Sequence, residues 1–156
     1  MYMRKSVSLL PMLVLGLGIA LMPSAALAET YDVTIKTGDV PWAGTNSNVW
    51  INLYAVRPVS RATVDSGEIQ LDNKGANLFT RNSKRTVRIT TPSDCPIKDI
   101  YGINIRQDDT GKEPDWYIET IELRDVGNGK TKTFLCNGWL NKQNGYQRYL
   151  KPFVNF

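Results

Sequence analysis

The sequence contains no histidine. This absence excludes a Ser-His-Asp or Cys-His nucleophile system, a histidine-ligated zinc ion and an imidazole base. A hydrolase that works with a pair of carboxylates is still compatible with the composition, since Asp108, Asp109 and Glu113 lie close together in the chain. A chain this short, however, offers little room for a deep substrate cleft. We therefore expect a protein that is not an enzyme.

The sequence also has little net charge. Without Arg4 and Lys5, which lie in the N-terminal segment, the 19 basic residues fall to 17 against 15 acidic ones, a net charge of +2. Proteins that bind nucleic acid concentrate Lys and Arg far more heavily, so we expect no nucleic-acid partner. The densest basic stretch is "RNSKRTVR" at residues 81–88. It is either a solvated strand edge or a contact for anionic lipid.

The N-terminal segment has the three parts of a secretory signal peptide. Arg4 and Lys5 precede the apolar run "LLPMLVLGLGIALM", and the run leads to Ala26-Leu27-Ala28, an A-x-A cleavage signature. The alternative is an uncleaved membrane anchor, but the run is short and ends without a basic stop. We expect a signal peptide over residues 1–28 and a secreted, periplasmic or extracellular, monomeric chain of one domain over residues 29–156.

Cysteine is limited to Cys95 and Cys136. Export would carry both residues into an oxidising compartment, where an even number of cysteines favours a disulfide. The bond would close a loop of 42 residues. Chain-entropy arguments give such a bond roughly 4 kcal/mol of stabilisation. The alternative is a pair of buried thiols.

No segment after residue 28 shows a sustained helical stripe, and apolar residues alternate with polar ones instead. Runs of this kind, bounded by Gly, Pro, Asn or Asp, lie at residues 31–35, 49–53, 69–71, 87–89, 100–105, 118–123, 134–136 and 146–154. Eight short strands separated by turns predict an all-β fold, an eight-stranded antiparallel β-sandwich of two sheets.

Two of these runs depart from strict alternation. Residues 100–105 and 118–123 both place apolar side chains at positions i, i+3 and i+5. A strand can keep all three on one face only by inserting an extra residue. The spacing therefore predicts one β-bulge near residues 101–102 and another near residues 119–120.

If consecutive strands alternate in direction, the loops after the first, third, fifth and seventh strands emerge at the same end. These loops are residues 37–47, 73–83, 108–115 and 137–145. The third reads "DDTGKEPD", with four carboxylates against one lysine. Carboxylates at this density repel one another unless a cation lies among them, and oxygen ligands on flexible loops suit calcium. No EF-hand spacing is present, so the loop is either a calcium site or a solvated acidic turn.

Four blocks of the sequence carry a family resemblance: "YDVTIKTGDVPWAGTNSNVWINLY", "LFTRNS", "IKDIYGINIRQDDTGKEPDWYIETIELRD" and "FLCNGWL". In this order and spacing they resemble the PLAT domain, the β-sandwich named after polycystin, lipoxygenase and alpha-toxin. The match runs from about residue 31 to the C-terminus. The resemblance implies a PLAT-like β-sandwich over residues 29–156 that attaches proteins to membranes or lipid-bearing partners, often with calcium.

Members of this family take calcium ligands from the first loop and from the loop before the Asp-Trp pair. The matching residues here are Asp39, Asn46, Asp109 and Asp115 as side-chain ligands, with Gly44 and Thr45 as donors of carbonyl oxygens. Relatives commonly carry aspartate where this chain has Asn46. The missing negative charge implies that calcium binding is weak or absent.

Trp42 lies among turn-forming residues in "TGDVPWAGTN", at a place where lipoxygenase-type relatives hold aromatic residues that enter the headgroup layer. An indole has an apolar body and one N–H donor, which suits a membrane interface. The alternative is that Trp42 packs on its own loop against Val40 and Pro41. Trp116 and Trp139 match packed positions of the family, so we expect both in the core.

Two function classes follow from these observations. The first is a secreted, non-catalytic module that associates with membranes or lipids through Trp42 with the aid of calcium. The second is an adaptor that binds a lipase-like or host protein. Its surface would be the face that Trp50 shares with Tyr54, opposite the core, although these residues are equally compatible with simple cover for their neighbours.

Overall fold

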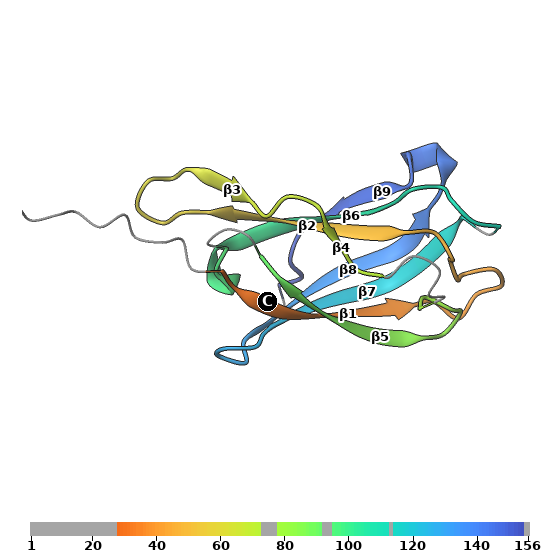
Figure 1. Ribbon diagram of the computed structural model, residues 1–156, viewed down its shortest axis with the longest axis horizontal. Coiled ribbons are helices and arrows are strands. Elements are labelled where there is room, and N and C mark those ends of the chain that lie inside the picture. Colours follow the sequence, from red (N-terminus) through yellow and green to blue (C-terminus); the bar gives the residue numbers. More distant parts are fainter. Residues whose placement is uncertain (1–27, 73–77, 92–94, 113, 155–156) are drawn as a thin grey trace, which may run out of the picture.

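The protein is described by a computed structural model that covers residues 28–72, 78–91, 95–112 and 114–154. Nine strands in these ranges form two antiparallel sheets that pack face to face (Figure 1). The predicted all-β sandwich is confirmed. The predicted signal peptide lies almost wholly outside the described residues, and neither of the two helical turns within them could span a bilayer.

One sheet has four strands in the order β5-β1-β7-β8, namely Lys84–Thr90, Thr30–Thr37, Trp116–Asp125 and Thr131–Leu140. The other has the order β3-β2-β6-β9, namely Thr63–Asp65, Val49–Val56, Ile100–Gln107 and Gln147–Leu150, and β4 (Ile69–Gln70) also pairs with β2. Two 3-10 turns, η1 (Ile97–Asp99) and η2 (Lys142–Asn144), precede β6 and β9.

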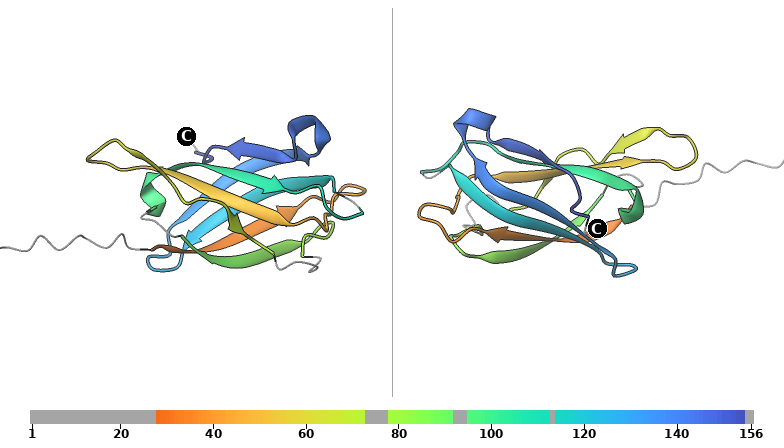
Figure 2. Two further views of the ribbon diagram at one scale, coloured as in Figure 1. Left: turned by 45° about the horizontal axis from the view of Figure 1, so that its top comes forward. Right: turned by 180° about the vertical axis from the view of Figure 1, so that it is seen from behind.

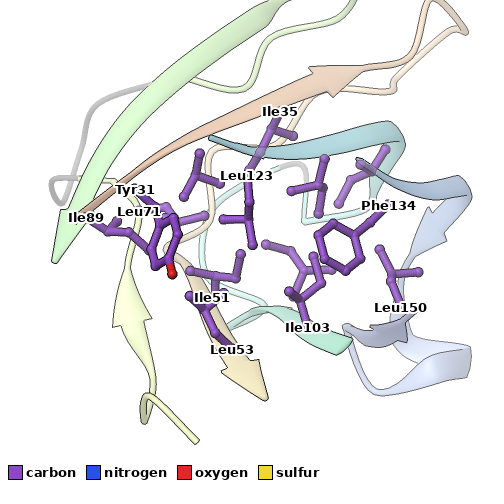
Figure 3. Close-up of a cluster of buried hydrophobic side chains, with 14 of the residues drawn as sticks. Tyr31, Ile35, Ile51, Leu53, Leu71, Ile89, Ile103, Leu123, Phe134 and Leu150 are labelled. Atoms are coloured by element: carbon purple, nitrogen blue, oxygen red, sulfur yellow. The ribbon is translucent and has the colours of Figure 1, made fainter. Parts of the chain in front are cut away.

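The core lies between the two sheets and is built from the alternating residues that the sequence pattern indicates. In β1 and β2, every second side chain is buried. Figure 3 shows side chains from both sheets pointing into this shared space. The labelled members are Tyr31, Ile35, Ile51, Leu53, Leu71, Ile89, Ile103, Leu123, Phe134 and Leu150. Alternation of period two places one face of each strand in the core.

The structure has nine strands rather than the predicted eight, and the additional one is β3. Its residues have no buried side chain and no apolar alternation, so periodicity could not reveal it. Both β3 and β4 run antiparallel to β2. The first residue after β3 continues the pairing, because Ser66 donates its backbone N–H to the carbonyl of Leu53 over 3.0 Å. The extra strand therefore leaves the alternation of chain direction unchanged.

Both predicted bulges are confirmed. In the β2–β6 pair, Tyr54 faces Gly102 while the next residue, Ala55, faces Ile100, so that Tyr101 is the inserted residue. In the β1–β7 pair the partners shift from Thr120 to Ile118, which leaves Glu119 unpaired. These insertions let the i, i+3 and i+5 residues of each strand all point into the core.

The predicted disulfide is wrong: Cys95 and Cys136 are both buried and are not joined. Cys95 precedes η1, where its carbonyl accepts a hydrogen bond from the Tyr31 hydroxyl. Cys136 lies in the middle of β8, five residues beyond Thr131, where this strand begins. Five strand residues span roughly 16 Å, whereas disulfide-bonded Cα atoms lie within about 7 Å of each other.

Candidate functional site

Four loops meet at one end of the sandwich, as strand parity predicts. We call it the four-loop end and define it by residues 38–48, 78–83, 108–112 with 114–115, and 141–146. The first loop contacts two of the others directly, because Thr45 N–H donates to the carbonyl of Phe79 and Asn48 N–H donates to Oδ1 of Asp108. Both views of Figure 2 show the first loop (orange) and the third (cyan) leaving the sheets at this end.

A buried polar pair holds these loops together. Thr45 donates its hydroxyl hydrogen to Oε1 of Gln107 over 3.0 Å. The amide nitrogen of Gln107 donates to the carbonyls of Pro114 and Leu140, the latter over 3.2 Å. Since Gln107 is 2% exposed, water does not compete for these bonds. Thr45 thus has a structural role through its side chain, and only its backbone carbonyl is available as the predicted ligand.

Sequence reasoning missed Gln107. A glutamine at the last position of a strand is expected at the surface, because uncharged amides are usually exposed. The available signal was parity: Gln107 follows the inward-facing Ile105 by two positions and therefore points into the core. A polar residue on the buried face needs partners, and the loops provide them.

Asp108 anchors the first loop to the third and is not exposed as an open ligand. Its carboxylate accepts hydrogen bonds from the side chain of Asn48 at 2.6 Å and from the backbone N–H groups of Asn48 and Thr110, both at 3.1 Å. Partial burial alone would raise the pKa of Asp108, but the hydrogen bonds from Asn48 and Thr110 outweigh it and lower this pKa below its ordinary value.

Trp42 projects from the tip of the first loop. Its side chain is 74% exposed, and its φ of 64° lies in the left-handed region that tryptophan rarely adopts. The indole forms one wall of a groove of about 410 Å³. The groove is lined by Pro41, Trp42, Gly44, Thr45, Asn46, Thr80 and Arg81. Trp42 is therefore not packed against its own loop, as the alternative prediction had it.

Backbone strain gathers at the same end. Six described non-glycine residues have a positive φ, and four of them lie in these loops, one in each: Trp42 at 64°, Asn82 at 56°, Asp109 at 57° and Tyr146 at 55°. A left-handed conformation costs about 1–2 kcal/mol for most residues and less for Asn and Asp. Strained conformations of this kind cluster at functional sites, where the surrounding structure maintains them.

The acidic side of the four-loop end is formed by the third and fourth loops. Asp109 accepts a hydrogen bond from the hydroxyl of Tyr146, and this bond, with the negative charges of Asp109 and Asp115, raises the pKa of Tyr146. The side-chain oxygen of Asn46 lies against Gly111 in the same region. Within the described residues, however, no three acidic, histidine or cysteine side chains gather as a metal site would require. Of the predicted side-chain ligands, two carboxylates (Asp109 and Asp115) and one amide (Asn46) lie on this side.

Asp39 lies on the opposite, basic side of Trp42. Its carboxylate accepts a hydrogen bond from Nε of Arg81 at 2.7 Å. Gly44 packs closely on the second loop, since a side chain there would contact the backbone of Phe79 and Arg81. The structure thus brings Asn46, Asp109 and Asp115 to one side of the first loop and pairs Asp39 with a cation on the other.

The predicted docking face is the outer face of the β2–β6–β9 sheet. Trp50 is half-buried there under the guanidinium of Arg106, which lies 4.2 Å from the ring centroid and is itself held by Glu68 at 2.6 Å. The ring of Tyr54 packs against two tyrosines that are more exposed than itself. Its ring centroid lies 6.3 Å from that of Tyr101 and 5.7 Å from that of Tyr149. The accessible aromatics of this face are therefore tyrosines and not Trp50.

The remaining two tryptophans differ from each other. Trp116 is fully buried, packs on Phe79 at 4.7 Å and donates its indole N–H to Thr37 at 3.0 Å, so the core position is confirmed. Trp139 is only half-buried and lies on the outer face of β8, edge-on to Tyr117 at 5.3 Å. The expected core position of Trp139 is wrong because its strand parity is that of Leu135, which also faces outward.

These features define a small antiparallel β-sandwich whose polar and aromatic residues gather in loops at one end. The chain belongs to the PLAT/LH2 domain family, whose sequence profile matches residues 31–153. The resemblance inferred from the sequence blocks is thus confirmed.

Two relatives are much longer than this chain. Lipoxygenase homology domain-containing protein 1 of Mus musculus is 34% identical over 115 residues, 74% of this chain but 5% of that protein. Polycystin-1 of Homo sapiens is 34% identical over 111 residues, 71% of this chain and 2% of that protein. The chain therefore corresponds to a small part of each.

Solved structures share the fold. A coral 8R-lipoxygenase, described as calcium-activated via a C2-like domain, superposes with a TM-score of 0.65 and 23% identity over 79% of this chain and 17% of the enzyme. The alpha toxin of Clostridium absonum gives a TM-score of 0.59 and 22% identity over 85% of this chain and 33% of the toxin. At these identities the likeness concerns architecture.

Proposed function

We propose that this chain is a non-catalytic module that associates with lipid surfaces, with the four-loop end facing the bilayer. The observation that carries the proposal is the exposure of Trp42, 74%, at the tip of the first loop. Tryptophan and tyrosine are enriched where proteins meet partners and at membrane interfaces, because one part of the side chain is apolar and the other polar. An indole favours the boundary between headgroups and acyl chains, where its ring is apolar and its N–H stays hydrated.

The backbone at Trp42 supports the same proposal. A tryptophan in the left-handed region costs stability, and glycine would adopt the same conformation freely. The loop nevertheless holds this conformation, with Ala43 N–H donating to the carbonyl of Val40 at 3.2 Å and Thr45 N–H donating to that of Phe79 at 3.0 Å. Because Trp42 lowers the stability of the fold in this conformation, we attribute its presence to a contact that its side chain makes with a lipid surface.

The available energy is sufficient for reversible association. An aromatic side chain buries about 150–250 Å². At about 25 cal/mol per Å², full burial of the indole contributes at most roughly 4–6 kcal/mol. Partial insertion contributes less, so Trp42 on its own suits weak and reversible binding. A second contact with the lipid surface is needed for a stable complex.

Calcium is the second element of the proposal, supported by the fold likeness to the coral 8R-lipoxygenase described as calcium-activated. Asn46, Asp109 and Asp115 would hold the ion, with backbone carbonyls of Gly44 and Thr45. A bound ion would supply positive charge between these carboxylates and an anionic bilayer. Because only two carboxylates, Asp109 and Asp115, belong to this ligand set, we expect a dissociation constant of about 10⁻⁴ to 10⁻³ M, as in extracellular modules. Asp39, paired with Arg81, is outside this set.

We further propose that the module is exported, with the segment of residues 1–28 acting as a cleaved signal peptide. The support is the sequence signature that ends at Ala28. N-terminal sequencing of the protein recovered from a secreting host should begin at Glu29. A protein that keeps residues 1–28 and sediments with the membrane fraction would contradict export.

Liposome co-sedimentation tests the main proposal. Wild-type protein should sediment with vesicles that contain phosphatidylglycerol, and more strongly with millimolar calcium than with a chelator. Trp42→Ala should reduce binding by about tenfold or more. The matched control is Val59→Ala, because Val59 is 97% exposed in the loop after β2, at the opposite end. Equal losses in both variants would indicate non-specific adsorption and contradict the proposal.

A second candidate function is protein docking through the outer face of Tyr54, Tyr101 and Tyr149. The observation that favours it is the packing of three tyrosine rings around Gly102, where a side chain would clash with Tyr149. The double variant Tyr101→Ser/Tyr149→Ser should lose a protein partner while binding vesicles normally. Loss of vesicle binding in this variant would instead assign the tyrosine face to lipid.

A further inference from the structure

Charge divides the four-loop end into two sides, with the first loop between them. Asp108, Asp109 and Asp115 lie on the side of the third loop, as described above. The second loop and the adjacent strand ends carry Arg81, Lys84 and other cations. The groove beside Trp42 opens toward the basic side, since Thr80 and Arg81 form its far wall.

Arg81 is incompletely engaged by the protein. Arg88 and Arg106 each bind a carboxylate with two nitrogens, Nε and Nη2. Arg81 binds Asp39 with Nε alone, and within the described residues its terminal nitrogens donate no hydrogen bond. Its side chain is 53% exposed. The fork of the guanidinium therefore stays available beside the indole of Trp42.

A pair of lysines extends this positive surface. Lys36 in β1 lies directly opposite Lys84 in β5 on the outer face of the sheet. The ammonium of Lys36 donates to the side chain of Asn82 at 2.8 Å, which places it next to Arg81 in the second loop. Like charges directly opposite each other destabilise a sheet. Such a pair is relieved when an anion lies over it.

We infer that the groove and this cationic surface bind the phosphate of a lipid headgroup directly, without calcium. Arg81 donates to the phosphate, Lys36 and Lys84 supply further positive charge, and Trp42 enters the interface beside the same lipid. Guanidinium groups bind phosphate with two parallel hydrogen bonds, which matches the available fork of Arg81. The inference rests on the proposed lipid association and assigns its ligand chemistry and a second, calcium-independent contact.

The position of the surface favours a lipid over another anionic ligand. The groove shares a wall with the exposed indole, so a phosphate bound there lies at the depth that Trp42 occupies at an interface. Each Lys or Arg near an anionic leaflet strengthens binding by about fivefold. Asp39, which pairs with Arg81, competes with the phosphate for the guanidinium.

The test measures co-sedimentation in the presence of a chelator, with vesicles of phosphatidylcholine, of phosphatidylcholine with phosphatidylglycerol, and of phosphatidylcholine with oleate at equal charge. Wild-type protein should bind the phosphatidylglycerol vesicles best. Arg81→Ala and Lys84→Ala should each reduce this binding by about fivefold. Asp39→Asn should increase it, because the variant releases Arg81. Arg57→Ala, an exposed arginine after β2 at the opposite end, is the matched control and should bind like wild type.

The outcomes separate the two levels of the argument. If wild-type protein binds no vesicle with or without calcium, the proposed function fails. If it binds only with calcium and Arg81→Ala equals wild type, lipid association stands and direct phosphate binding is overturned. Equal binding to oleate and phosphatidylglycerol vesicles also overturns it, since charge alone would then explain the attraction. Thermal melting of each variant confirms that the fold is retained.

Discussion

Thr45 and Gln107, which are 62 positions apart in the chain, form a buried hydrogen bond of 3.0 Å at the centre of the four-loop end. Thr45 belongs to the loop that carries Trp42. Gln107 ends β6 and bonds to Pro114 in the third loop and to Leu140 at the end of β8, just before the fourth loop. This pair therefore sets the position of the proposed lipid anchor relative to the acidic loop.

Removal of the Gln107 amide should destabilise the fold. Gln107→Leu removes the donor to the Leu140 carbonyl and leaves the Thr45 hydroxyl and the Pro114 carbonyl only their longer mutual bond of 3.4 Å, and a buried unsatisfied group costs about 1–3 kcal/mol. Thr45→Val should destabilise less, and the double variant should fall short of the sum of the two because they share one bond. Urea unfolding measures these free energies. Gln147→Leu, at an exposed glutamine in β9, is the control, and strictly additive effects would contradict the coupling.

Replacement of Trp42 by glycine should separate stability from binding. Glycine adopts a φ of 64° without steric cost, so Trp42→Gly should unfold at the same or a slightly higher temperature than wild type. The same variant should bind vesicles at least as weakly as Trp42→Ala. Differential scanning calorimetry and co-sedimentation provide the two measurements. A markedly lower melting temperature would show that the indole supports the fold.

Calcium should lower the pKa of Tyr146. In the absence of the ion, the hydrogen bond to the Asp109 carboxylate and the charges of Asp109 and Asp115 raise this pKa. A cation held by the two carboxylates would offset their charge and make the phenol easier to ionise. NMR titration of ring-labelled tyrosine should show the shift, with Tyr146→Phe to identify the signal. An unchanged pKa in saturating calcium would place any bound ion elsewhere.

Asp108 should contribute to loss of stability in acid. Its pKa in the folded protein is depressed, because the hydrogen bonds from Asn48 and Thr110 outweigh its partial burial. The resulting stabilisation is present above the unfolded pKa of about 3.9 and is lost as pH falls through the lower folded value. Asp108→Asn should therefore reduce stability at neutral pH and show a shallower decline below about pH 4. Urea unfolding at both pH values checks this, and an unchanged slope would contradict it.

Local periodicity was sufficient for most of the architecture. The alternation in residues 31–35 and 49–53 follows from the two-residue repeat of a strand, which depends on neighbouring positions alone. The i, i+3, i+5 spacing located both bulges for the same reason. Parity placed the four loops at one end, and it survived the missed strand β3 because β3 and β4 run in the same direction.

Tertiary structure alone decided which side chains became partners. The sequence could not indicate that Asp39 pairs with Arg81, 42 positions away, or that Gln107 holds Thr45. It also favoured a bond between Cys95 and Cys136, which lie before η1 and within β8 and are not joined. The pattern of a strand determines the face on which a residue lies, but contacts between loops depend on how several backbones end near one another. Those end points are set only when the whole core has packed.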